Sequence, residues 1–283
     1  MRIYANWLYK GLLGLLFPAH GCPLCGLKNQ TGLCARCRLF LEHTAQEPYC
    51  QVCGRFFSAP GSGLCLECSG RTWPFVLSRA VVPYEGVVRS AVHRLKFGGK
   101  QAAVEFLGGL MADLLRREAA SREVEALVPV PLSARRLKER GFNQAELLAR
   151  VIAEACGLAL IPALVKVTDT PPQAQLDRVS RQANIRDSFR VAESCSIKGK
   201  VIAVVDDIFT TGSTLSAAAE TLLGGGAVRI FGVVLASGRT FPNYDFLRQS
   251  EGEFFRFHRQ NPLGGKLYTG LSTLSTRFYL INI

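Results

Sequence analysis

Four Cys-x-x-Cys pairs between residues 22 and 68 constrain the fold of this chain more than any other feature of its sequence. Two residues between two thiols let both sulfurs of one tight turn reach a single tetrahedral ion, and two such turns complete a four-cysteine zinc site. Glycines after two of the turns, Gly26 and Gly54, allow the sharp bend. We therefore expect two structural zinc ions, held by Cys22, Cys25, Cys34, Cys37, Cys50, Cys53, Cys65 and Cys68.

The spacing of the eight cysteines permits two ways of sharing them. The simpler one gives the first four thiols to one ion and the last four to the other, and an interleaved pairing satisfies the same spacing. A disulfide framework is typical of secreted proteins, and nothing in the sequence indicates export. A redox role would need only one pair, beside a thioredoxin-like βαβ unit. Zinc would contribute on the order of 10 kcal/mol to the folding of a segment with few large aliphatic residues.

The composition is that of a folded protein with excess positive charge. Apolar residues make up 48% of the chain, enough for at least one packed core. The net charge of +12 favours anionic partners such as nucleic acid or phosphorylated small molecules. The best candidate for a membrane span, Leu12 to Phe17, is far too short to cross a bilayer. We expect an amphipathic helix in residues 1–20, no stable membrane insertion and a cytoplasmic location.

From Val76 onward, apolar runs alternate with helical patterns. Continuous apolar strands between amphipathic helices indicate a mostly parallel sheet covered on both faces. In such sheets, ligands bind beyond the carboxyl ends of the strands. The sequence predicts strands at 76–84, 126–132, 160–167, 200–207 and 228–236, and helices at 86–97, 102–117, 143–156 and 213–223.

The stretch VVDDIFTTGST, Val204 to Thr214, ends the clearest of these strands with two acids and a small polar loop. The helix that follows presents unpaired amides and a partial positive charge, which suit a phosphate. Gly212 allows close backbone approach, and the two carboxylates could accept hydrogen bonds from vicinal hydroxyls of a sugar. The stretch therefore predicts a ribose 5-phosphate site built from Asp206, Asp207, Thr210, Thr211, Gly212, Ser213 and Thr214.

Two other interpretations explain less of this stretch. An ordinary Ser or Thr N-cap accounts for one hydroxyl, but not for the acidic pair or the whole TTGST run. An ATPase also ends a strand in acidic residues, but it needs an upstream G-x-x-x-x-G-K-[ST] segment, and this sequence has none.

Several segments together resemble the ComF family, which includes GntX-type proteins. VIAVVDDIFTTGST resembles the phosphoribosyl-pyrophosphate (PRPP) signature of type I phosphoribosyltransferases. VPVPLSARRLKERGFNQAELLA, QAQLDRVSRQANIRDSF and LKF are similar to further segments of the family, and the paired knuckles match its double zinc ribbon. The resemblance covers roughly residues 6 to 239. It implies a Rossmann-like, mostly parallel sheet of the type I phosphoribosyltransferase kind, with a small N-terminal zinc-ribbon module.

The resemblance also implies roles for single residues. Asp206 and Asp207 would be the catalytic pair at the ribose hydroxyls, with residues 210–214 around the 5-phosphate. The turn after Pro131 would be the pyrophosphate loop, where an unusual peptide conformation exposes backbone amides. Mg²⁺ would bridge pyrophosphate and ribose oxygens, with most of its ligands from substrate and water. Further contacts are implied for Arg140, Asn143 and Gln144, and for Arg181 in a mobile loop with Gln173 and Asn184.

Two functions follow from this resemblance. The first is a protein of DNA uptake, in natural transformation or in the use of external DNA, that binds PRPP or a related phosphoribosyl ligand. Its implied partners are single-stranded DNA and competence proteins such as a DNA helicase. The second is an active PRPP-dependent glycosyltransferase with an unidentified acceptor, which would displace pyrophosphate at the anomeric carbon. Arg135 to Arg140 with Phe56, Phe57 and Trp73 would suit a DNA strand, although we expect the aromatics in the core of the ribbon module and its junction instead.

The predicted organisation therefore has four parts. The helix of residues 1–20 precedes the double zinc ribbon at 21–70 and the phosphoribosyltransferase-like domain at 76–239. Residues 240–283 have no clear periodicity or motif and depart from the family pattern. We expect poor order in that tail.

Overall fold

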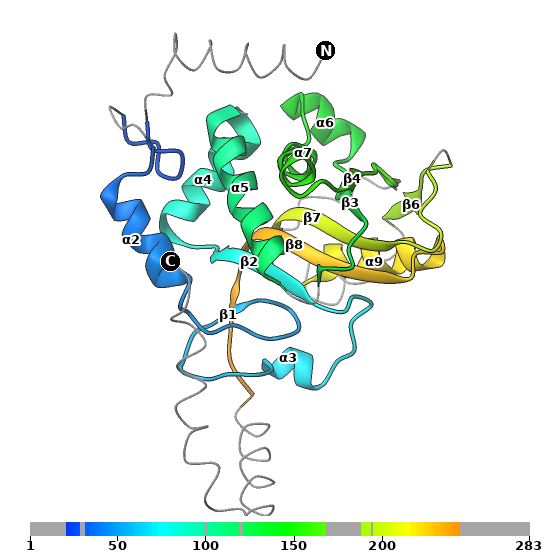
Figure 1. The fold of residues 1–283 in the computed structure, drawn as a ribbon, viewed down its shortest axis with the longest axis horizontal. Coiled ribbons are helices and arrows are strands. Elements are labelled where there is room, and N and C mark those ends of the chain that lie inside the picture. Colours follow the sequence, from blue (N-terminus) through cyan, green and yellow to red (C-terminus); the bar gives the residue numbers. More distant parts are fainter. Residues whose placement is uncertain are drawn as a thin grey trace, which may run out of the picture.

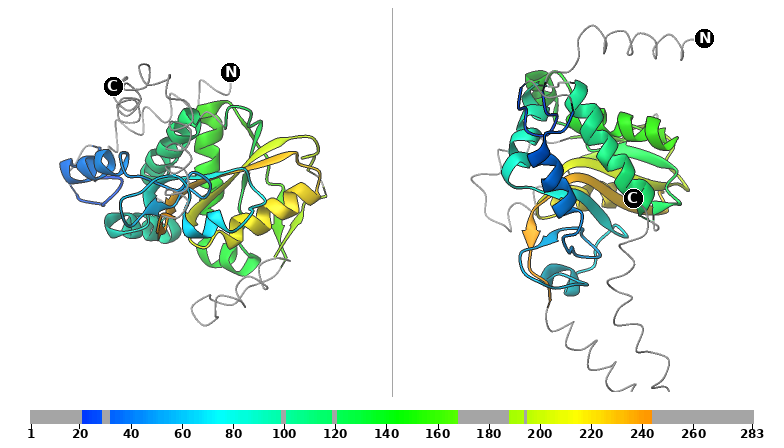
Figure 2. Two further views of the ribbon diagram at one scale, coloured as in Figure 1. Left: turned by 90° about the horizontal axis from the view of Figure 1, so that it is seen from below. Right: turned by 60° about the vertical axis from the view of Figure 1, so that its left-hand side comes forward.

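Figure 1 shows a computed structural model of the chain. It describes residues 21–28, 32–98, 101–118, 121–167, 188–193 and 195–243. A sheet with helices on both faces forms the larger part, and the cysteine-rich segment lies along one side of it (Figures 1 and 2). The helix expected in residues 1–20, the loop containing Arg181, and residues 244–283 of the tail lie outside the described residues.

The central sheet has five strands that all run parallel, as the sequence predicts. Their order across the sheet is β2-β8-β7-β3-β4. Strand β7 lies in the middle and pairs with β8 on one side and β3 on the other. The strands span Ser78–Pro83 (β2), Ala126–Pro129 (β3), Ala159–Leu160 (β4), Val201–Phe209 (β7) and Arg229–Ser237 (β8).

Successive side chains of β7 point to opposite faces of the sheet and pack into two separate cores. Ala203 and Val205 belong to a core shared with helices α4, α5 and α7, whereas Ile202 and Val204 belong to a core shared with α9. All four side chains are buried, because helices cover both faces of the sheet (Figure 1). The helices span Gly86–Gly98 (α4), Gln101–Arg117 (α5), Gln144–Cys156 (α7) and Ser213–Gly224 (α9).

Two predicted strands differ from those in the structure. Strand β7 continues two residues past Asp207, to Phe209, so the acidic pair lies inside the strand rather than closing it. The single strand expected at 160–167 is two strands, because Pro162 has no amide hydrogen to continue the ladder. Its second half, β5 (Leu164–Lys166), instead pairs antiparallel with β6 (Phe189–Val191) in a separate sheet.

A short helix, α6 (Ala134–Arg140), follows β3 and contains the RRLKER run. None of its residues is buried, so its basic side chains lie on a solvated surface. The helix ends at Gly141, which takes a left-handed conformation.

The cysteine-rich segment is joined to the end of the chain that the structure describes. It contains α2 (Ala35–Thr44), β1 (Phe56–Phe57) and α3 (Leu66–Ser69). Strand β1 pairs with β9 (Arg239–Thr240), which returns from the sheet to the ribbon (Figure 2). The amide of Asn243 also donates to the carbonyl of Leu64, at 2.8 Å. The first four residues of the expected tail therefore pack on the ribbon.

Among the described residues, no helix combines the length and the apolarity needed to pass through a bilayer.

Candidate functional site

The eight paired cysteines form two separate tetrads. One contains Cys22 to Cys37 and the other Cys50 to Cys68, and within each tetrad all four sulfurs lie within 4.8 Å of one another. Such clustering of four thiols fits one tetrahedral zinc ion per tetrad. The tetrads follow the simpler of the two pairings, with consecutive knuckles sharing an ion. Gly26 and Gly54 have φ of 78° and 68°, as the turn geometry predicts.

Hydrogen-bond donors surround the sulfurs, as thiolates bound to a metal require. The amide of Cys34 donates to Cys22 Sγ at 3.5 Å, and the amide of Cys65 donates to Cys50 Sγ at 3.3 Å. The buried Arg55 guanidinium donates to two sulfurs of the second tetrad and forms an ion pair with Glu67 at 2.6 Å. A thiolate cluster offsets the cost of burying this cation. The donor set of both tetrads thus fits structural zinc.

The acidic pair lies near the carboxyl end of β7, with its two side chains on opposite faces of the sheet. The Asp207 side chain is 8% exposed and forms an ion pair with Lys96 of α4, Nζ to Oδ2, at 2.9 Å. Oδ1 of Asp206 accepts a hydrogen bond from the amide of Asp207 at 2.8 Å. The two carboxylates therefore differ: one is paired with a cation, and the other faces the loop that follows the strand.

Asp206 holds its proton more tightly than an ordinary aspartate. Burial is the main cause that raises its pKa well above the usual value, and the adjacent charge of Asp207 adds to the effect. Lys96 acts in the opposite direction but more weakly. Perturbed acids of this kind cluster at functional sites, and this one lies at the edge of a parallel sheet where ligands bind.

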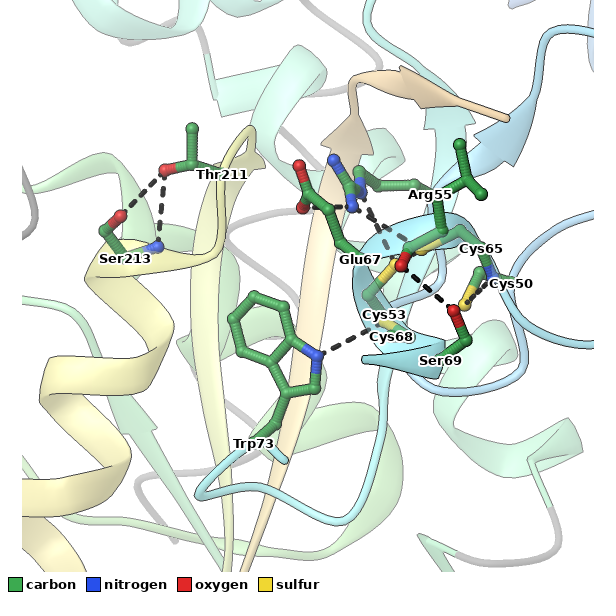
Figure 3. A network of polar contacts seen from close by, with 11 residues as sticks. Cys50, Cys53, Arg55, Cys65, Glu67, Cys68, Ser69, Trp73, Thr211 and Ser213 are labelled. Carbon is green, nitrogen blue, oxygen red and sulfur yellow. Dashed lines mark hydrogen bonds and ion pairs between the residues drawn. The ribbon is translucent and has the colours of Figure 1, made fainter. Parts of the chain in front are cut away.

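Residues 210–212 connect β7 to α9 beside Asp206, and Ser213 and Thr214 begin the helix. Gly212 is the N-cap of α9, with φ of 77°, and no side chain caps the helix there. The Thr211 and Ser213 hydroxyls lie 2.8 Å apart, and the Ser213 amide donates to Thr211 Oγ1 at 3.4 Å (Figure 3). Gly212 and Ser213 line a hollow of about 20 Å³ together with Asp206, Thr210 and Thr214. Amides and hydroxyls at a helix N-terminus suit a phosphate group.

The loop after β3 lies directly beside the acidic pair. The amide of Val130 donates to the carbonyl of Val205, at 2.9 Å, and Pro131 follows at once. Asn143 fixes this loop from the other side: its Nδ2 donates to the Val130 carbonyl at 3.0 Å, while its Oδ1 caps α7. One side chain therefore holds the β3 loop and the start of α7 together at the carboxyl edge of the sheet.

Arg140 and Gln144 extend this edge. Arg140 Nη1 donates to Gln144 Oε1 at 3.1 Å, and Gln144 is buried at the start of α7. The unusual peptide conformation that the resemblance implies after Pro131 stays a prediction. The structure thus places the predicted residues at one edge of the sheet, with Arg181 outside the described residues.

Two residues near the site were not among the predicted site residues. In the sequence, Lys96 is visible only as a basic residue of a predicted helix and as part of the LKF segment. Nothing in the sequence indicates that it contacts Asp207. Trp73 packs against Phe209, with ring centroids 6.2 Å apart, at the junction of ribbon and domain. Phe56 and Phe57 are buried within the ribbon core, as one of the two interpretations of these aromatics predicts.

Comparisons with known proteins agree with this organisation. A family model described as a double zinc ribbon domain matches residues 12–69. The DNA utilization protein YhgH of Salmonella typhimurium is 31% identical over 218 residues, which span 70% of this chain and 94% of that protein. Competence protein ComFC of Bacillus subtilis is 28% identical over 214 residues, spanning 70% and 80%.

Solved structures of phosphoribosyltransferases are also similar, at a low level. The adenine phosphoribosyltransferase of Thermoanaerobacter pseudethanolicus is 16% identical, covering 48% of this chain and 82% of that one, with a TM-score of 0.31. A likeness at this level carries no argument about ligand or reaction.

Proposed function

The chain belongs to the ComF family, and from that premise we propose that the carboxyl edge of its sheet binds PRPP or a related phosphoribosyl ligand in the uptake or use of DNA. The observation that carries the proposal is the junction of β7 and α9. Two acids there precede a helix N-terminus whose cap is glycine. The names of the relatives, one a DNA utilization protein and one a competence protein, support a role in handling DNA.

Each part of the junction would bind a different part of the ligand. The amides at the start of α9, with the hydroxyls of Thr211 and Ser213, would hold the 5-phosphate. Asp206 would accept hydrogen bonds from the ribose hydroxyls, because it faces the hollow between strand and helix. The β3 loop, held by Asn143, would place its amides beside the pyrophosphate.

Mg²⁺ fits this edge, because carboxylate oxygens are the ligands it prefers and PRPP supplies further oxygens. When bound, it would neutralise charge on the pyrophosphate. Asp207 forms an ion pair with Lys96, so Asp206 is the carboxylate of the pair that would lie nearest the Mg²⁺. We place the protein in the cytoplasm, where PRPP is available.

Calorimetric titration of PRPP with Mg²⁺ into the zinc-loaded protein tests the proposal. We expect saturable heat that is lost in Asp206→Asn and in Asp207→Asn. Glu220→Gln is a matched control, since Glu220 is an exposed acid of α9 away from its N-terminus. Absence of heat with the wild-type protein, or equal binding by the two aspartate variants and the control, would contradict the proposal.

A further inference from the structure

We propose that Trp73 couples the second zinc tetrad to the loop at residues 210–214, so that metal occupancy of this ribbon sets the affinity of the loop for phosphate. The ligand part of this inference rests on the proposed function. The structural part, that the metal site shapes the loop, stands without it.

Trp73 forms a hydrogen bond with a cysteine of the second tetrad. Its Nε1 donates a hydrogen bond to Sγ of Cys68 at 3.2 Å (Figure 3). The indole nitrogen can only donate, and a thiolate is a better acceptor than a thiol. Because zinc holds its cysteine ligands as thiolates, metal binding strengthens this bond and fixes the orientation of the ring.

The opposite edge of the same ring touches the phosphate loop. A Cβ atom on Gly212 would lie 2.7 Å from Trp73 Cζ3 and 2.8 Å from Cη2, so the ring lies directly against the loop backbone. Phe75 and Phe209 pack around the ring, with centroids 5.1 and 6.2 Å from that of Trp73. The Arg71 guanidinium also lies over the ring, 4.1 Å from its centroid.

Contacts on several sides leave the indole little room to move by itself. In a close-packed region, a displacement of one group is passed to its neighbours rather than absorbed. Loss of metal from the second tetrad would release the Cys68 thiol, then the Trp73 ring, and then the backbone at Gly212. Trp73 is thus a positioning residue, since it acts on the ligand through the loop.

The first tetrad supplies a matched control, because its ribbon contacts a different element. There the Arg94 guanidinium of α4 donates to the Leu24 carbonyl at 2.5 Å, and Leu24 is buried in the core on the α4 face of the sheet. Removing one thiol from each tetrad therefore separates the effect of the second metal site from that of zinc in general.

Amide hydrogen exchange of the full-length, ligand-free protein tests the structural part. We compare Cys68→Ser with Cys25→Ser, each of which lacks one thiol of one tetrad. We expect exchange across residues 209–216 to be about tenfold faster in Cys68→Ser, the factor for losing one charge-assisted hydrogen bond, and unchanged in Cys25→Ser. Equal exchange of this segment in the two variants overturns the inference.

Trp73→Phe keeps the tetrad and an aromatic ring but loses the hydrogen bond to Cys68. We expect this variant to retain the wild-type zinc content, to show faster exchange at 209–216 and to bind PRPP with Mg²⁺ several-fold more weakly. If amides 209–216 of Trp73→Phe exchange at the wild-type rate, the hydrogen bond from the indole to Cys68 has no role in positioning the loop. This result decides the question even if Cys68→Ser fails to fold. If the wild-type protein binds no PRPP, the proposed function fails, while the exchange data still decide whether the metal site shapes the loop.

Discussion

Replacing Gly212 with alanine probes how tightly the loop at residues 210–214 is packed. The left-handed φ of 77° disfavours any residue with a Cβ, at a cost of about 1–2 kcal/mol. The new Cβ would also lie 2.6 Å from Phe209 Cζ and 2.7 Å from Trp73 Cζ3, and such overpacking costs about 1–3 kcal/mol. We therefore expect Gly212→Ala to lower the free energy of unfolding by about 2–5 kcal/mol.

A second glycine separates the two contributions. Gly199 has φ of 75° and nothing within 4 Å of the position of an added Cβ, so Gly199→Ala includes the backbone cost alone. Urea unfolding of the zinc-loaded proteins, followed by far-ultraviolet circular dichroism, measures both changes. Gly212→Ala should be the more destabilising by about 1–3 kcal/mol. Equal losses of stability would refute the close packing of Trp73 and Phe209 on the loop.

Three further substitutions test the electrostatics and the framework of the site. The pKa of Asp206 is raised in the folded state, so the stability of the wild-type protein falls as pH rises from the unfolded pKa of about 4 through the folded pKa. Asp206→Asn removes this loss. In thermal unfolding the variant should therefore be the more stable protein at pH 8, and the difference should close towards pH 4. Lys96→Met leaves the buried Asp207 carboxylate without its cation and should lower the free energy of unfolding by about 1–3 kcal/mol. The double variant with Asp207→Asn should recover most of this lost stability. If the two substitutions instead cause additive losses, the ion pair contributes nothing. Asn143→Ala removes a helix cap and the bond to Val130, which should cost about 1–2 kcal/mol and weaken PRPP binding in calorimetry, whereas Glu220→Gln, at an exposed position of α9, should leave the affinity unchanged.

The parts of the fold that follow from local pattern were predictable. The run VIAVV between polar residues predicts a strand buried on both faces, and the glycines after Leu223 predict where α9 ends. The cysteine spacing predicts two four-thiol sites, because ligand geometry restricts the turn more strongly than packing does, but it leaves open which pairs share an ion. The acidic pair and the TTGST run predict the loop between β7 and α9, because the residues that carry its chemistry lie within one short segment of the sequence.

Contacts between distant segments could not be predicted in this way. Nothing local to LKF indicates that Lys96 reaches Asp207, because the direction of α4 is set by packing on the sheet. The two-residue pairing of β9 with β1 is too short to leave a periodic signal. Trp73 stood out only as an aromatic residue near the ribbon, since its bond to Cys68 and its contact with Gly212 exist only after folding.

The central claim is that the junction of β7 and α9 binds the phosphoribosyl group. A crystal structure of the zinc-loaded protein with PRPP and Mg²⁺ tests it most directly. We predict the 5-phosphate about 3 Å from the backbone amides at the start of α9, with the ribose hydroxyls against Asp206. Ligand density at another surface, with this junction unchanged, would contradict the claim.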